Sequence, residues 1–196
     1  MATTSRLEAF SDGVLAVIIT IMVLELKVPE GTSLQNLAPL LPHLLVYALS
    51  FHVIGTYWNN HHHLLKTVKV ITPRIMWSNL LLLFCLSLIP FFTAWFGEHP
   101  LSTIPNAAYG MSLLAGGLGY FILVRAILAS DQEKGEVRRA VGSDIKGKLS
   151  LVVYFAGVLL AFVNPWVAIA LYVLVAMMWF LPERRLAFAT KPSANG

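Results

Sequence analysis

The sequence contains a series of apolar runs, each close to the length that crosses a lipid bilayer. The first of them lies within RLEAFSDGVLAVIITIMVLEL, residues 6–26. A helix needs about 20 mostly apolar residues to cross a ~30 Å hydrocarbon core, because each residue advances it by only ~1.5 Å. On this basis the sequence predicts six membrane spans, at about 7–26, 42–65, 76–96, 107–128, 149–163 and 165–181.

The composition agrees with an integral membrane protein. Of 196 residues, 57% are hydrophobic and 12% are charged, and the mean hydropathy is +0.72. Soluble domains carry roughly 25% charged residues, and here the deficit is spread over several runs, which excludes a soluble domain with one anchor. We therefore expect an all-α membrane protein with a single six-helix domain over 1–182 and a disordered tail at 183–196.

The last two predicted spans are short, so a second topology has to be weighed. Asn164-Pro165 is a turn signal that divides them into a hairpin. A five-span interpretation would need one helix over 149–181, broken by Pro165. The basic residues favour the even number, because all of them except Lys27 fall on one side of the six-span topology. Lysine and arginine mark the cytoplasmic side, so we expect both termini in the cytoplasm and the protein in the cell membrane.

The first span has a stripe that allows two interpretations. Gly13, Val17, Thr20 and Leu24 share one helical face, and Ile21 lies beside it. Such a stripe can pack against a neighbouring helix. If several copies surround an axis, it can instead line a pore, in which apolar rings gate by dewetting and threonine hydroxyls face the ions.

Asp12 is the residue that calls for a functional explanation. An ionisable side chain within a span is costly and usually faces a bundle interior or a water-filled cavity. Arg6 is six residues away, which is not a neighbouring position on a helix. The second and third spans offer a complementary set of donors and acceptors near the same boundary. These groups are Trp58, Asn60, His61 and Asn79.

The first half of the chain resembles a known family. Arg6, Phe10, Ser11 and Asp12 form the pattern R-x-x-x-F-S-D, and a threonine follows the aspartate by eight residues. Further matches in order and spacing are Trp58 with His61, then Asn79, then Pro90-Phe91. These motifs are similar to the signature of the transmembrane protein 175 family, which contains potassium channels of endosomes and lysosomes and shorter bacterial relatives.

The resemblance implies a homotetramer of six-helix subunits in which the first helix lines a central pore. It places the family's constriction on Val17, further apolar layers on Ile21 and Leu24, and a threonine layer on Thr20. It also places Phe10, Ser11 and Asp12 in a polar network with Arg6, His61 and Asn79. Valine is smaller than the isoleucine or leucine of the family, so Ile21 or Leu24 could form the narrowest ring instead.

The sequence thus predicts a modestly selective potassium channel that conducts passively. Its partners would be other copies of the chain, the lipid bilayer and the permeant potassium ions, with no nucleic acid, cofactor or enzymatic activity. The alternative is a proton-coupled secondary transporter that uses Asp12 and His61. Transporters often contain broken helices and internal repeats, and neither feature is visible here.

Three other features receive ordinary explanations. Gly116 to Tyr120 superficially resembles a potassium-channel filter, but it lies within a span, where small residues favour close helix contacts. His61, His62 and His63 are consecutive and point in three directions, so we expect no metal site, with His61 facing the bundle and the others facing water or headgroups. Glu25 and Lys27 allow either an acidic mouth that concentrates cations or an ordinary interfacial pair.

Overall fold

The computed structural model describes residues 4–130 and 144–180, and all secondary structure in these stretches is helical. The predicted tail, 183–196, and most of the polar connection between the fourth and fifth predicted spans lie outside the described residues. The described helices are α1 (Thr4–Leu24), the 3-10 helix η1 (Leu34–Leu40), α2 (Leu41–Lys66), α3 (Pro73–Ser87), α4 (Ile89–Glu98), α5 (Thr103–Ser130), α7 (Ile145–Leu160) and α8 (Pro165–Phe180).

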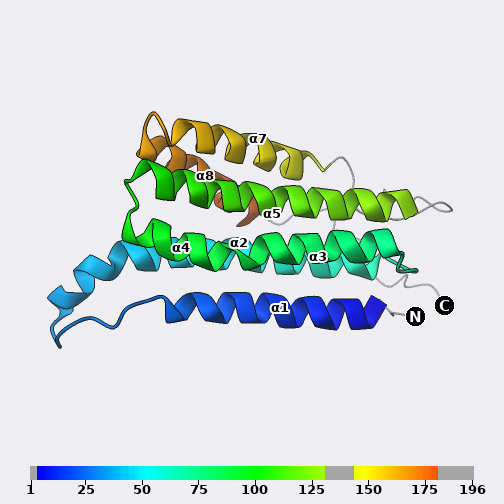
Figure 1. The fold of residues 1–196 in the computed structure, drawn as a ribbon, viewed down its shortest axis with the longest axis horizontal. Coiled ribbons are helices and arrows are strands. Elements are labelled where there is room, and N and C mark those ends of the chain that lie inside the picture. The colour runs from blue at the N-terminus through cyan, green and yellow to red at the C-terminus, as the bar shows by residue number, and fades with distance from the viewer. Residues whose placement is uncertain (1–3, 131–143, 181–196) are drawn as a thin grey trace, which may run out of the picture.

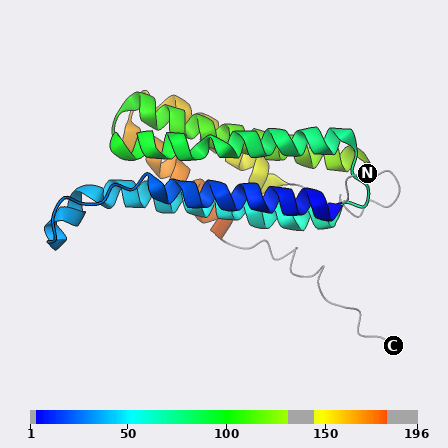
Figure 2. The same ribbon diagram turned by 60° about the horizontal axis from the view of Figure 1, so that its bottom comes forward.

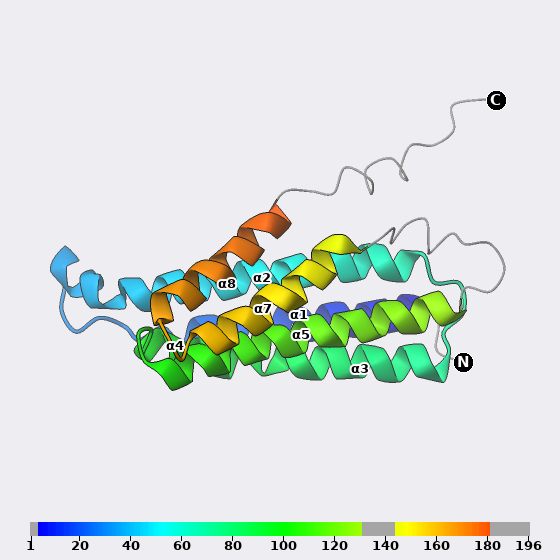
Figure 3. The ribbon, with the colours of Figure 1, turned by 90° about the horizontal axis from the view of Figure 1, so that it is seen from above.

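The helices form an elongated bundle in which α1 occupies one edge (Figure 1). The first helix packs chiefly against α2, α3 and α4, whereas α7 and α8 pack against each other and against α5 on the other side. The 3-10 helix and the first turns of α2 extend beyond the neighbouring helices at one end (Figure 2). Seen from above, α7 and α8 run at an angle to the longer helices (Figure 3).

Four helical segments among the described residues are long and apolar enough to cross a membrane. They are Thr4–Leu24, Leu34–Lys66, Pro73–Glu98 and Thr103–Ser130. Each covers one of the first four predicted spans. The helices α7 and α8 have 16 residues each, which corresponds to about 24 Å of helix and is short for a ~30 Å core.

The third predicted span is not one continuous helix. It is divided at Leu88 into α3 and α4, and we had expected an uninterrupted span over 76–96. Pro90 has no backbone N–H and its ring clashes with the carbonyl four residues earlier, so proline interrupts a helix about one turn before its own position. The amide of Leu88 accordingly bonds to the Cys85 carbonyl at 3.4 Å, in a tighter turn.

A buried stripe fixes the face that α1 turns toward its own bundle. Its members recur every three or four residues, as expected for one side of a helix: Leu7, Ser11, Leu15, Ile18 and Met22. The side chains of Leu15 and Met22 are each only 1% exposed. The remaining face of α1 is therefore directed out of the subunit.

Close packing and a buried polar group hold the middle of the bundle together. In α5 a Cβ added at Gly119 would lie 3.0 Å from the backbone Cα of Leu82, so the glycine stretch permits close contact with α3, as predicted. The Ser50 hydroxyl lies 2.9 Å from the Tyr109 hydroxyl and accepts from Thr93 at 2.8 Å. These bonds link α2, α4 and α5, and each hydroxyl is satisfied without water.

Candidate functional site

The outward face of α1 carries the residues that the resemblance implies for an ion pathway. Val17 is 54% exposed, Ile21 is 44% exposed and Leu24 is 78% exposed, although all three are large apolar side chains. Thr20 lies on the same face and is also exposed. The described residues of the subunit leave this face exposed, so lipid or another copy of the chain can contact it.

The hydroxyl of Thr20 is oriented by its own helix. Its Oγ1 lies 3.0 Å from the carbonyl oxygens of both Ala16 and Val17, to which it donates. A hydroxyl has one hydrogen and two lone pairs. The hydrogen is therefore directed back to the helix, and the oxygen retains acceptor capacity toward the outward face.

A groove runs along one side of this face. It has a volume of ≈ 830 Å³ and lies between α1 and the region where α3 meets α4. Phe10, Val17 and Ile21 line it on α1, and Pro90 and Phe91 line it on α4. The helix break at Leu88 thus shapes a surface beside the exposed stripe. Phe10 is 53% exposed here, so it is directed out of the subunit.

A directional chain of hydrogen bonds joins three helices near the start of α1. His61 Nε2 lies 2.6 Å from Asn79 Oδ1, and because an amide oxygen only accepts, Nε2 carries the hydrogen. The Asn79 amide donates to Ser11 Oγ at 2.9 Å, and Ser11 donates to the Leu7 carbonyl at 2.8 Å. His61, Asn79 and Ser11 are each fully buried. The sequence analysis had placed these three residues in one network, and the structure brings them into contact.

Asp12 belongs to a separate contact. Its Oδ1 accepts from the indole N–H of Trp58 at 3.0 Å, so one of the partners expected from the sequence is present. The hydrogen bond to Asn79 is made by the neighbouring Ser11 instead. The Arg6 side chain is exposed at the beginning of α1. The single network implied for these residues therefore consists of a buried chain through Ser11 and a more exposed contact through Asp12.

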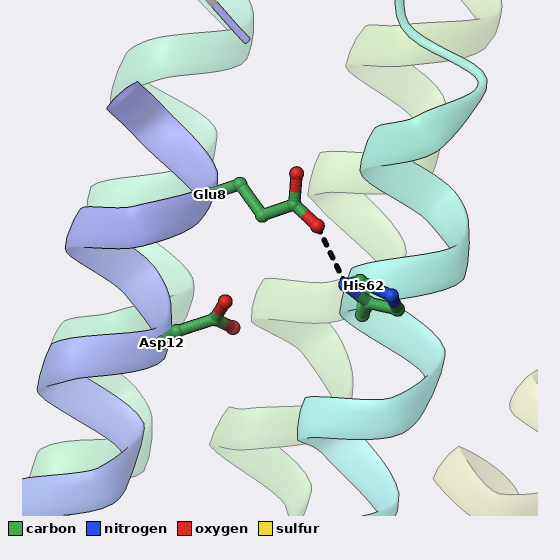
Figure 4. A group of neighbouring side chains, drawn as sticks. All are labelled: Glu8, Asp12 and His62. Carbon is green, nitrogen blue, oxygen red and sulfur yellow. Dashed lines mark ion pairs between the residues drawn. The ribbon is translucent and has the colours of Figure 1, made fainter. Parts of the chain in front are cut away.

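Sequence reasoning missed the partner of His62. We expected this side chain to face water or headgroups, but its Nδ1 lies 2.5 Å from Glu8 Oε1 and its ring stacks on Trp58 at 6.2 Å. Figure 4 shows Glu8 and Asp12 extending from α1 toward His62 on α2. Donor atoms of these three residues lie within 4.8 Å of one another. Glu8 and Asp12 are one helical turn apart, which is the only local signal that the sequence offered.

The other end of α1 leads to an ion pair. Lys27 Nζ lies 2.7 Å from Glu98 Oε1, and this bond, together with the charge of Glu98, raises the pKa of Lys27. Both side chains are well exposed. Glu25 lies at the end of the groove beside the stripe. Lys27 is thus paired with α4, and Glu25 contributes a carboxylate to the lining of the groove.

Comparison with known proteins assigns these features to a family. The family described as "Endosomal/lysosomal potassium channel TMEM175" matches residues 6–90, which include the whole of α1 beyond its first turn and both polar contacts. A potassium channel of Chryseobacterium sp. (strain P1-3) is 47% identical over 189 residues, covering 96% of this chain and 98% of that one. The chain belongs to the TMEM175 family. It is accordingly a multi-pass membrane protein of an ion-channel family and not an enzyme.

Other relatives extend the match. A potassium channel of Streptomyces collinus is 34% identical over 128 residues, covering 61% of this chain and 62% of that protein. Among solved structures, the crystal structure of a lysosomal potassium-selective channel TMEM175 homolog from Chamaesiphon minutus superposes with a TM-score of 0.78 at 28% identity. The alignment covers 90% of this chain and 96% of that one. The TMEM175 fold therefore extends well beyond the segment that carries the motifs.

Proposed function

We propose that this TMEM175 protein forms a homotetrameric potassium channel in the cell membrane, with α1 of each subunit lining a central pore. Each subunit would cross the bilayer six times and keep both termini in the cytoplasm. The short helices α7 and α8 would then be accommodated by local thinning of the bilayer. Conduction would be passive, and selectivity for potassium would be modest.

The observation that carries this proposal is the division of α1 into two faces. One face is buried against α2, α3 and α4, and the other presents Val17, Thr20, Ile21 and Leu24. A lipid-facing surface has no need of a hydroxyl in the middle of an apolar helix. An ion pathway does, because oxygen atoms replace part of the hydration shell of the ion. The position of α1 at the edge of the bundle leaves this face available to other copies.

Apolar rings on such a helix would form the gate. Val17 and Leu24 are seven residues apart, so their rings would be separated by about 10 Å along the axis. Narrow apolar rings expel water and thereby block hydrated ions without a physical plug. Valine is the smallest of the three candidate gate residues, so Ile21 or Leu24 would provide the narrowest ring where the helices are parallel.

The polar contacts near the beginning of α1 would hold the pore helix in register. Ser11 is tied to Asn79 of α3, and Asp12 is tied to Trp58 of α2. A helix fixed at one end by directional bonds can still move at its other end. This arrangement favours a gate at Ile21 or Leu24, which are far from the bonded end.

A proton-coupled transporter is the competing function. It would use Asp12 and His61 as proton carriers, and it would be expected to contain a broken helix at its binding site. The break at Leu88 separates α3 from α4, whereas α1 and α2, which carry Asp12 and His61, are continuous helices. His61 is also enclosed and bonded to Asn79. Both observations favour the channel.

The proposal is tested by potassium flux from liposomes that contain the purified protein. Substitution of Val17, Ile21 or Leu24 by asparagine should hydrate the corresponding ring and raise the potassium leak. Val152→Asn is the matched control, because Val152 is an exposed apolar residue of α7, which packs chiefly against α5 and α8. The channel proposal would be abandoned if none of the three α1 variants exceeded this control, or if flux required a proton gradient.

A further inference from the structure

We propose that Glu8, Asp12 and His62 form a binding site for a divalent transition-metal ion, with Zn²⁺ as the best fit. The site is built from two helices that face each other. Glu8 and Asp12 lie one turn apart on α1, and Trp58 and His62 lie one turn apart on α2. Figure 4 shows that both carboxylates extend from α1 toward the imidazole.

The charges of this cluster favour a cation. Two carboxylates one turn apart on a helix repel each other. Trp58 offers Asp12 a neutral N–H at 3.0 Å, which orients one carboxylate oxygen and leaves the other available. A divalent ion placed between the carboxylates would remove the repulsion.

The imidazole nitrogen that faces the cluster supplies the second observation. His62 Nδ1 lies 2.5 Å from Glu8 Oε1, so an imidazole nitrogen of α2 and a carboxylate oxygen of α1 already face each other. Once this nitrogen has lost its proton, its lone pair can bind a metal ion.

The chemistry and spacing of the donors fit zinc. Imidazole nitrogen and carboxylate oxygen bind Zn²⁺ at about 2.0–2.2 Å. Two ligands of one tetrahedral ion are therefore about 3.3 Å apart. The three donor atoms here already lie within 4.8 Å of one another. The Glu8 carboxylate has to withdraw from His62 by less than about an ångström, which a side-chain rotation provides.

The site also has an entrance and room for water. The side chains of His62 and Glu8 are 31% and 23% exposed, so an ion can reach them without unfolding of the bundle. Three protein ligands plus one water is a common arrangement for zinc. Since α1 lines the pore under the proposed function, on which this consequence rests, a bound ion would clamp the pore helix to α2.

The test is metal binding by tag-free protein in lipid nanodiscs, measured by calorimetry with Zn²⁺ and by absorption spectroscopy with Co²⁺. We expect a single Zn²⁺ per chain and Co²⁺ bands typical of mixed nitrogen and oxygen ligands. His62→Asn and Glu8→Gln should each weaken Zn²⁺ binding by at least about tenfold. His63→Asn is the matched control, because it removes the adjacent imidazole and leaves the proposed ligands intact.

Binding and conduction are measured separately, so the site and the channel can fail independently. No saturable binding to the unmodified protein would overturn the metal site, whatever the potassium flux. Binding that survives both ligand substitutions, or that is lost equally in His63→Asn, would also overturn it. Selective loss in His62→Asn and Glu8→Gln would establish the site even in a protein that does not conduct.

Discussion

The side-chain amide of Asn79 donates to the hydroxyl of Ser11 at 2.9 Å, linking residues 68 positions apart in the sequence. The same amide accepts from His61 at 2.6 Å. One side chain of α3 therefore fixes α1 and α2 together. Ser11 is the serine of the R-x-x-x-F-S-D motif, so the motif has a structural role that is independent of the ions.

Loss of this bridge should destabilise the subunit. Asn79→Leu would leave the buried His61 N–H without an acceptor and would remove the N–H donor from the Ser11 oxygen, and an unsatisfied buried group costs about 1–3 kcal/mol. Thermal unfolding in detergent should therefore show a clear decrease in Tm. Ser11→Ala should lower Tm more than Ser112→Ala, because among the described residues Ser112 bonds only to the Tyr109 carbonyl of its own helix. Equal effects of the two serine substitutions would contradict the bridge.

Alanine substitutions at Gly119 and at Gly13 should affect the stability of the subunit differently. At Gly119 the added methyl would approach the Leu82 backbone to 3.0 Å, so α3 and α5 would have to separate, at a cost of about 1–3 kcal/mol. At Gly13 an added Cβ would have no atom of another described helix within 4 Å, so alanine should leave the Tm of the subunit unchanged or slightly raise it. Unfolding of the two variants in the monomeric state checks this difference, and a stable Gly119→Ala protein would refute the close contact.

The hydroxyl of Thr20 should affect ion selectivity. Thr20→Val keeps the shape of the side chain and removes the oxygen, so the permeability ratio of potassium to sodium should fall. Thr20→Ser keeps the oxygen and should preserve most of the ratio. The measurement is the reversal potential under potassium and sodium gradients. If the valine and serine variants have the same ratio, the hydroxyl does not contact the ion.

The Lys27–Glu98 ion pair should contribute little to the stability of the subunit. Both groups are exposed, and solvent screens such pairs. Because Glu98 raises the pKa of Lys27, the stabilisation is fully present below the ordinary lysine pKa of about 10.4 and is lost as the pH rises through the raised value. The difference in Tm between the unmodified protein and Lys27→Met should be small at neutral pH and vanish in strong alkali. A Tm difference that increases as the pH rises would contradict the expected loss of stabilisation in alkali.

The sequence predicted the fold where the physical signal was local. The length of the apolar runs located the long helices, and the spacing of Val17, Ile21 and Leu24 placed them on one face, which is the exposed one. The break at Leu88 was missed, although Pro90 carries a sufficient local reason for it. We had considered Pro90 only as part of a motif.

The contacts between helices were only partly predictable. The complementary donors and acceptors around Ser11 and Asp12 could be grouped, because buried polar groups require partners. The sequence could not predict which partner each of these residues would bind. Rotation of α1 by one residue decides whether Ser11 or Asp12 faces Asn79. The contact between Glu8 and His62 joins residues 54 positions apart, and no spacing within either helix indicates it.

The central claim is that the exposed face of α1 lines the ion pathway. Its most direct test is block of potassium flux by a charged thiol reagent in a Cys85→Ser background. Leu24→Cys should lose flux on reaction, and Val152→Cys, at an exposed position of α7, should react without effect. Complete labelling of the Leu24→Cys variant with unchanged flux would show that this face does not line the pathway and would contradict the account.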